Sequence, residues 1–296
     1  MKSIAIIGAG SVGKTLGHLF LARQIFRIGH VYARSEARAR EAVDFIGAGA
    51  PVWRLSDAEP ADLTVIATPD DAIAPTCGQL FANDTATQGG IVFHCSGATP
   101  SSVLERARER GSAIASLHPM KSFADPATSV ETFPGTYCAL EGDADAVEAL
   151  TDAVTGIGGK PFTIATQEKL IYHAAAVFVC NTLPPLVEAG LDCCARAGVE
   201  RDQAMEILRP LVEETVANIF AVGPAQALTG PVARGDAALV RRQLAAVEAW
   251  RPDYGEIYRV LAGATAELAR AAGSARPDGL AEIDRLVHRN VNLNRP

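Results

Sequence analysis

The stretch that decides the fold is Ile4-Ala5-Ile6-Ile7-Gly8-Ala9-Gly10-Ser11-Val12-Gly13, four apolar residues that run directly into a glycine-spaced turn. The apolar run predicts a buried strand, and Leu16, Leu19 and Phe20 on one side of residues 14–23 predict a helix after the turn. A strand, this glycine spacing and a helix in that order are typical of a dinucleotide-binding site.

Each glycine of this turn has a physical role. Gly8 permits the tight turn, Gly10 lets the backbone approach a pyrophosphate, and Gly13 lets the helix pack close to the sheet. The N–H groups at the start of the helix then face the phosphate charge. The turn therefore predicts NAD(P)H or FAD, unless it is a tight turn without a nucleotide. The expected contacts with the pyrophosphate are Gly8, Ala9, Gly10, Ser11, Val12 and Gly13.

The end of the second predicted strand distinguishes one dinucleotide from another. An NAD site usually has Asp or Glu there, which accepts hydrogen bonds from the ribose hydroxyls. This chain has Arg34 followed by Ser35. A guanidinium pairs with a 2′-phosphate, and Ser35 adds a donor, so NADP(H) is favoured. The alternative is that Arg34 is a solvated cation beside Arg38 and Arg40 on a surface helix.

Length and charge narrow the function classes. The 296 residues suit two domains, each able to bury its own core. The formal charge of −7, from 27 basic and 34 acidic residues, argues against nucleic acid or an anionic membrane as the main partner. We expect a small-molecule substrate instead.

The chain has the features of a cytoplasmic protein. Its first strand follows Met1-Lys2-Ser3 directly, without the pattern of a signal peptide, and no apolar run has membrane-spanning length. The six cysteines form no C-x-x-C pair, which predicts reduced thiols in the core. No His/Cys cluster has the spacing of metal ligands, so no metal is expected.

Two halves of the chain differ in pattern. Short apolar strands alternate with helical stretches up to about residue 165, which predicts an α/β, doubly wound parallel sheet. The remainder is helical throughout. We therefore expect a cofactor-binding domain over residues 1–165 and an all-α domain for substrate binding and dimerisation over residues 166–296, with a kink or break at Pro184-Pro185. The predicted strands are residues 4–7, 30–33, 52–55, 63–67, 91–93, 113–117, 137–140 and 162–164, and the later helices are residues 201–220, 237–250, 255–272 and 280–289.

Small and polar residues follow three of the predicted strands, where ligands bind in such sheets. Thr68-Pro69-Asp70 is expected to line the cofactor pocket, or else to be a turn with an N-capping aspartate. Ser96 and Gly97 are placed to bind a substrate carboxylate or the cofactor amide. His118 brings a titratable imidazole to the same edge, as a catalytic or a structural residue.

The helical half begins with the sharpest candidate for chemistry. Lys169 and His173 lie four residues apart on one helical face, followed by an apolar run and by Asn181, a candidate substrate ligand. The alternative is an exposed lysine and a histidine satisfied in a domain interface. Arg234 follows a turn rich in Gly and Pro, and either clamps a substrate carboxylate or is a loop cation.

Together these motifs resemble a family of NADP-dependent oxidoreductases that join an N-terminal Rossmann-like domain to a C-terminal helical domain of unknown function. The resemblance covers nearly the whole chain and implies the fold, the cofactor class and a homodimer built on the helical domain. It rests on residues 8–13, 68–71, 94–97, 117–120, 169–181 and the Leu-Thr-Gly-Pro-x-x-Arg-Gly-Asp stretch at residues 228–236.

More distant families suggest a mechanism. Lys169-Leu170-x-x-His173 is similar to the Lys-Leu-x-x-Asn helix of ketopantoate reductases and β-hydroxyacid dehydrogenases, in which the lysine is the general acid/base and the asparagine binds substrate. Here His173 stands at the asparagine position, so His173 or Lys169 is the expected proton donor. His118-Pro119-Met120 resembles a segment of prephenate dehydrogenases, and the overall plan resembles pyrroline-5-carboxylate reductase.

These observations lead to one main hypothesis and one alternative. The first is an NADP(H)-dependent oxidoreductase that moves a hydride to or from a small carboxylate-bearing carbonyl, hydroxyl or imine compound held between the two domains. The alternative is a non-catalytic NADP(H)-binding sensor or assembly protein.

Overall fold

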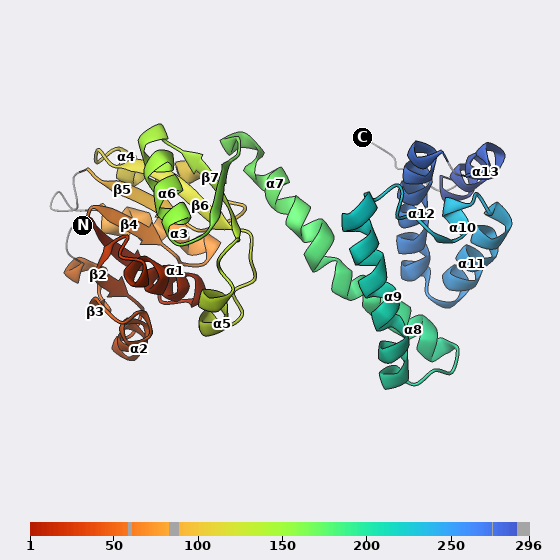
Figure 1. Cartoon of the computed structure of the whole chain (residues 1–296), viewed down its shortest axis with the longest axis horizontal. Helices are drawn as coiled ribbons and strands as arrows, with labels where there is room; N and C mark the ends of the chain where they lie inside the picture. The colour runs from red at the N-terminus through yellow and green to blue at the C-terminus, as the bar shows by residue number, and fades with distance from the viewer. Residues whose placement is uncertain (59–60, 83–88, 274, 289–296) are drawn as a thin grey trace. The chain divides into compact units, whose positions relative to one another are not determined.

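The computed structural model describes residues 1–58, 61–82, 89–273 and 275–288 (Figure 1). The chain folds into two compact units, residues 1–181 (unit 1) and residues 182–296 (unit 2). Unit 1 contains an eight-stranded sheet in the order β3-β2-β1-β4-β5-β6-β7-β8. The strands are β1 (Ser3–Ile7), β2 (Arg27–Tyr32), β3 (Ala50–Val52), β4 (Leu63–Ile66), β5 (Ile91–His94), β6 (Ala113–Pro119), β7 (Tyr137–Gly142) and β8 (Lys160–Thr163).

Helices cover both faces of this sheet, because alternate side chains of each buried strand point to opposite sides. Ile6 packs with Phe20 of α1 on one face, where α2 and α6 also lie. Ile7 packs with Ile73 of α3 on the other face, together with α4. These helices are α1 (Ser11–Ala22), α2 (Glu36–Ile46), α3 (Asp70–Leu80), α4 (Glu105–Arg108), α5 (Pro126–Glu131) and α6 (Ala144–Gly156). The predicted α/β, doubly wound class is confirmed.

One strand departs from the all-parallel sheet that the sequence predicts. β7 runs antiparallel to β6 and parallel to β8. The connection from β6 to β7 contains only the short helix α5, which packs against α1 through a bond from Thr15 Oγ1 to the Pro126 carbonyl. Without a crossover helix on the sheet, the chain returns in the opposite direction.

Unit 1 ends later than the boundary predicted after residue 165. A 3₁₀ turn (Thr166–Glu168) leads into α7 (Lys169–Ala176), which is followed by a π-helical turn (Val177–Asn181). α7 belongs to unit 1 because its first residue, Lys169, is buried against the sheet. The expected break falls just before Pro184-Pro185, which occupy the first turn of α8 (Leu183–Arg196), where a missing N–H is tolerated.

Unit 2 consists of helices. α10 (Gly230–Ala233), α11 (Ala237–Trp250), α12 (Pro252–Ala272) and α13 (Pro277–Val287) share one apolar core, in which Val240, Ala266 and Ile283 are fully buried. By contrast, α8 and the long helix α9 (Arg201–Val222) each bury one residue. The predicted helices of this half all exist; Arg289, the last residue expected in α13, lies outside the described residues.

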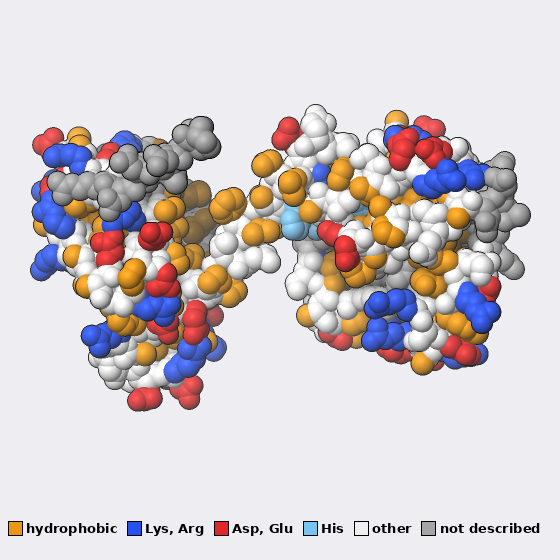
Figure 2. Space-filling view, turned by 180° about the vertical axis from the view of Figure 1, so that it is seen from behind, with side chains coloured by type: hydrophobic (Ala, Val, Ile, Leu, Met, Phe, Trp, Pro, Cys, Tyr) orange, Lys and Arg blue, Asp and Glu red, His pale blue; other side chains and the backbone are white. Residues whose placement is uncertain are grey.

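The segment Thr166–Arg196 is the one stretch of the described chain that is long and apolar enough to cross a membrane by length and composition, with a mean hydropathy of 1.5 over an 18-residue window. A single such helix is weak evidence for a membrane span, and it contains Lys169, whose ammonium is paired inside unit 1. The face in Figure 2 carries acidic and basic side chains side by side, without the single-sign surface typical of nucleic-acid binding.

Candidate functional site

The glycine turn after β1 combines two crowded positions with one open position. Gly8 has a φ of +122°, and a Cβ there would lie 2.5 Å from the Ala67 carbonyl oxygen. A Cβ on Gly13 would lie 2.2 Å from the Gly8 carbonyl oxygen. A Cβ on Gly10 would meet no described atom within 4 Å. Gly8 and Gly13 therefore hold the turn against β4 and α1, whereas Gly10 leaves space beside its backbone.

The first turn of α1 offers free N–H groups at that open position. The first bond of the helix runs from Lys14 N to the Gly10 carbonyl over 2.9 Å, so the N–H groups of Ser11, Val12 and Gly13 have no acceptor within the helix. Gly10 has no side chain to cap them, and the first turn has no acidic residue. Open space and unpaired N–H groups at a helix N-terminus fit a diphosphate.

The end of β2 presents the two residues expected at a 2′-phosphate. Arg34 is exposed and pairs with no carboxylate in the part of the chain that the structure describes. Ser35 is the N-cap of α2, and its oxygen accepts the Arg38 N–H over 3.5 Å, which leaves the hydroxyl hydrogen available. Arg40, in contrast, is paired with Glu36. The donor set fits a phosphate group here.

Thr68-Pro69-Asp70 follows β4, next to the glycine turn. Thr68 Oγ1 is buried without a hydrogen-bond partner among the described residues, as expected for a group that awaits a ligand or water. Pro69 is the N-cap of α3, so Asp70 does not cap this helix. Its carboxylate instead accepts the Ser96 hydroxyl over 2.7 Å, which joins the end of β4 to the end of β5.

The loop after β5 brings glycine against two imidazoles. A Cβ on Gly97 would lie 2.5 Å from His173 Cδ2 and 2.7 Å from both His118 Cε1 and His118 Nε2. Only glycine leaves room for both rings. Ser96 is 6% exposed, and besides donating to Asp70 it accepts the N–H groups of Ala98 and Thr99, so its hydroxyl shapes the loop.

His94 precedes this loop and is fully buried. Its Nδ1 accepts the Ser96 N–H over 3.1 Å, and its Nε2 lies 3.3 Å from the Pro100 carbonyl. Burial, and next the charge of Lys169, lower the pKa of His94 to about 4. It is a neutral, satisfied core histidine.

Three rings gather where β6 meets α7. His118 Nδ1 lies 3.2 Å from the Tyr172 hydroxyl, and the ring centroids of His118 and His173 are 6.0 Å apart. Burial, then the charges of Lys169 and His173, lower the pKa of His118 to about 4. His173 is half-buried and has no hydrogen-bond partner among the residues that the structure describes. Its ring nitrogens are therefore free for a ligand.

Lys169, one turn before His173 in α7, lies in a buried network. Its side chain is 1% exposed; the ammonium donates to the Ser116 hydroxyl and lies 3.5 Å from Glu141 Oε1. Burial lowers the pKa of Lys169, and the charge of Glu141 opposes this effect. Burial alone would raise the pKa of Glu141, but bonds from Ser101 at 2.7 and 2.8 Å and the charge of Lys169 leave it lowered. The result is a buried ion pair with every charge satisfied.

The two remaining expected residues belong to other elements of the chain. Asn181 is exposed at the last residue of unit 1, eight residues beyond His173 and therefore about 12 Å along a helix. Arg234 is exposed in unit 2, where the neighbouring Asp236 caps α11. Sequence reasoning missed Ser116 and Glu141, which lie within strands, and Tyr172, although Tyr172 stands directly before His173.

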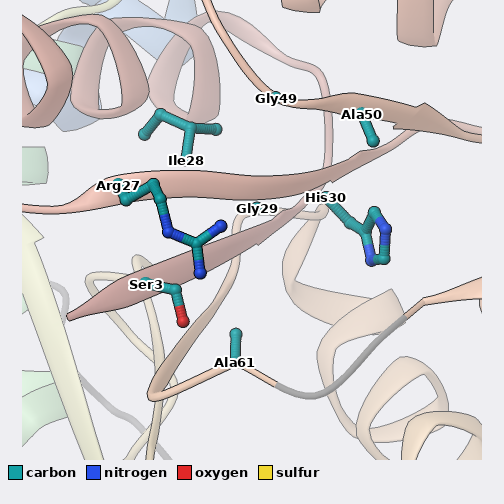
Figure 3. A pocket seen from close by; sticks show the side chains of 8 residues that line it. All are labelled: Ser3, Arg27, Ile28, Gly29, His30, Gly49, Ala50 and Ala61. Atoms are coloured by element: carbon teal, nitrogen blue, oxygen red, sulfur yellow. The ribbon is translucent and has the colours of Figure 1, made fainter.

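One hollow in unit 1 lies away from this cluster. It has a volume of about 370 Å³ and is lined by Ser3, Arg27 and Ala50, the first residues of β1, β2 and β3 (Figure 3). These are the amino ends of parallel strands, whereas the glycine turn lies at their carboxyl ends. The hollow is therefore separate from the candidate site.

Comparison with known proteins agrees with this architecture. Residues 1–119 match a Rossmann-like domain, and residues 136–265 match a domain of unknown function, DUF2520. This is the domain combination that the motifs resembled. No curated protein matches the chain in sequence.

Three solved structures show the same fold. Protein TM1727 from Thermotoga maritima is 24% identical, with a TM-score of 0.74 over 90% of this chain and 98% of that chain. A provisionally named NADP oxidoreductase, BF3122 from Bacteroides fragilis, is 22% identical, with a TM-score of 0.70 over 90% and 98%. The imine reductase from Myxococcus stipitatus in complex with NADP⁺ is 18% identical, with a TM-score of 0.60 over 91% and 93%.

Proposed function

We propose that this protein is an NADP(H)-dependent oxidoreductase that reacts with a small carbonyl, hydroxyl or imine compound at the carboxyl edge of the sheet. The observation that carries this proposal is the convergence of His118 and His173 on Gly97, at the edge where the glycine turn also lies. Hydride transfer to a C=O or C=N group requires a proton source near the acceptor atom. The fold likeness to a provisionally named NADP oxidoreductase and to an imine reductase supports the same class.

The cofactor assignment follows from the fit of the residues. The turn from Gly8 to Gly13 would hold the pyrophosphate, Arg34 and Ser35 the 2′-phosphate, and Thr68 the region next to β4. When bound, NADP(H) supplies or accepts the hydride. NADP(H) is proposed over NAD(H) because the end of β2 presents a guanidinium and no carboxylate.

The chain's own residues divide the remaining work. We assign His173 as the general acid, because its ring nitrogens are free. In the reductive direction, an N–H bond of His173 breaks and the proton joins the oxygen or nitrogen of the substrate as the hydride reaches carbon. His118 is neutral and orients the reacting group by a hydrogen bond. Lys169 is a positioning residue, because its ammonium is enclosed by Ser116 and Glu141.

Substrate contacts and assembly stay predictions. A carboxylate on the substrate is expected from the sequence, and the candidate substrate ligands are Ser96, Gly97, Asn181 and Arg234. The same holds for a homodimer through the helical domain. Four apolar residues of α8 would allow such an interface if exposed: Leu183 and Leu186 are exposed, Val187 is half-buried, and Leu191 is buried within unit 2.

The proposal is tested by a panel of small keto acids, hydroxy acids and cyclic imines, with the absorbance of NADPH as the readout. At least one substrate should be turned over, and His173→Ala should lower kcat by about 10²–10⁴-fold, the usual contribution of a general acid. His288→Ala, at an exposed histidine in unit 2, is the control. Tight NADPH binding without turnover of any compound would favour the sensor instead.

A further inference from the structure

Tyr172 is held in place by two neighbouring rings. Its hydroxyl lies 3.2 Å from His118 Nδ1, and the two rings meet edge to face at 84° with centroids 5.8 Å apart. The ring of Phe162 also packs against Tyr172, at 65° and with centroids 6.1 Å apart. The phenol is therefore aimed at one nitrogen of His118.

The direction of this hydrogen bond follows from the chemistry of the pair. Burial raises the pKa of Tyr172 to about 12, so the phenol keeps its proton. His118 is neutral and has a single N–H, because burial, Lys169 and His173 outweigh the opposing charge of Asp70. The phenol has no other acceptor among the described residues, so donation to Nδ1 satisfies both groups. The proton of the imidazole is then on Nε2.

We propose that Tyr172 is a positioning residue that fixes the tautomer of His118 and thereby presents an Nε2–H donor toward Gly97. The Nε2 edge is the one that a Cβ on Gly97 would touch, so the donor faces the loop at the carboxyl edge of the sheet. The catalytic meaning of this inference rests on the proposed function. A neutral imidazole that donates an N–H stabilises negative charge that develops on a substrate, without giving up its proton.

The tautomer is measured by NMR on the full chain labelled with ¹⁵N-histidine at pH 7. The chain has six histidines, and the signals of His118 are identified by their loss in His118→Gln. We expect a protonated Nε2 and a hydrogen-bonded, unprotonated Nδ1 in the parent. Tyr172→Phe should convert His118 to a mixture of tautomers.

Tyr137→Phe is the matched control. Tyr137 also packs edge to face against Phe162, and it makes no hydrogen bond to His118 among the described residues. The His118 signals of Tyr137→Phe should equal those of the parent. A protonated Nδ1 in the parent, or an unchanged His118 spectrum in Tyr172→Phe, would overturn the inference.

The kinetic readout separates this inference from the proposed function. With a substrate found, Tyr172→Phe should lower kcat about tenfold with KM nearly unchanged, as expected for one misplaced hydrogen bond. A raised KM with unchanged kcat would contradict it. If the spectra are as expected but no substrate is turned over, the inference about the tautomer stands and the proposed function fails. If a substrate is turned over but the His118 spectrum of Tyr172→Phe equals that of the parent, the proposed function stands and the inference fails.

Discussion

The glycine turn and the first turn of α7 both lie at the carboxyl edge of the sheet, but different contacts stabilise them. At the turn, Gly8 and Gly13 bring backbone against backbone, and the groups left for a ligand are N–H groups. At α7, buried polar and charged side chains from three elements meet, with Lys169 against Ser116 of β6 and Glu141 of β7. The glycine turn therefore depends on close backbone contacts that only glycine permits, and the α7 network depends on paired side chains.

This difference determines how each region should respond to substitution. The turn has almost no side chains to lose, so an added methyl group is its most damaging change. The α7 network is shielded from solvent, so a removed charge is its most damaging change, because the partner stays buried and unpaired. The predictions below test each half of this contrast.

The largest effect is expected from Lys169→Met. It leaves Glu141 buried without its cation, which should lower the free energy of unfolding of unit 1 by about 3–5 kcal/mol. Urea unfolding can be followed by Trp53 in a Trp250→Phe background, since the chain has two tryptophans, one in each unit. Lys160→Met, at an exposed lysine of β8, is the control. The double variant Lys169→Met/Glu141→Gln should regain most of the lost free energy of unfolding. If it does not, the destabilisation by Lys169→Met comes mainly from altered packing and not from the unpaired carboxylate.

The glycine turn is tested by a matched pair of substitutions. Gly13→Ala should destabilise unit 1 by about 3 kcal/mol, because its Cβ would lie 2.2 Å from a backbone oxygen. Gly10→Ala should fold like the parent, because its Cβ meets no described atom within 4 Å, but should weaken NADPH at least about tenfold. Thermal unfolding and NADPH titration separate the two outcomes. Unchanged NADPH binding by Gly10→Ala would contradict the proposal that this turn binds the pyrophosphate.

The same contrast explains what the sequence could predict. The glycine turn is contiguous, so its spacing predicted strand, turn and helix correctly, and short apolar runs and long helical stretches predicted the other strands and the later helices. The α7 network is not contiguous. Ser116 and Glu141 are opposite each other only through the antiparallel register of β6 and β7, which periodicity does not report. Lys169 was therefore expected as a proton donor facing a ligand, whereas the structure encloses it.

A substitution of Arg34 tests the proposed side-chain contact with the 2′-phosphate, which adds to the backbone contacts of the glycine turn. Arg34→Asp should weaken NADPH about a hundredfold, through lost pairing and added repulsion, and leave NADH nearly unchanged. The measurement is the ratio of the two dissociation constants. Arg23→Asp, at an exposed arginine at the far end of α1, is the control for net charge. Equal losses for both cofactors would place the 2′-phosphate elsewhere.

His94 ends β5, the strand between β4 beside the glycine turn and β6 of the α7 network, and its ring accepts the Ser96 N–H in the loop that contains Gly97. Its pKa is about 4 in the folded chain, against an ordinary value of 6.5. Between these values the unfolded chain binds a proton that the folded chain does not, so stability falls as the pH drops from 6.5 towards 4.

The expected loss from His94 between pH 7 and pH 5 is about 2 kcal/mol, measured by urea unfolding at both pH values. His94→Gln should remove this part of the pH dependence, whereas His288→Gln, at an exposed histidine, should keep it. His118 acts in the same direction in the parent and in both variants, so the difference between the curves isolates His94. If the unfolding free energies of the parent and of His94→Gln changed equally with pH, the folded chain would accept a charged His94 at little cost. The burial of this ring would then not lower its pKa.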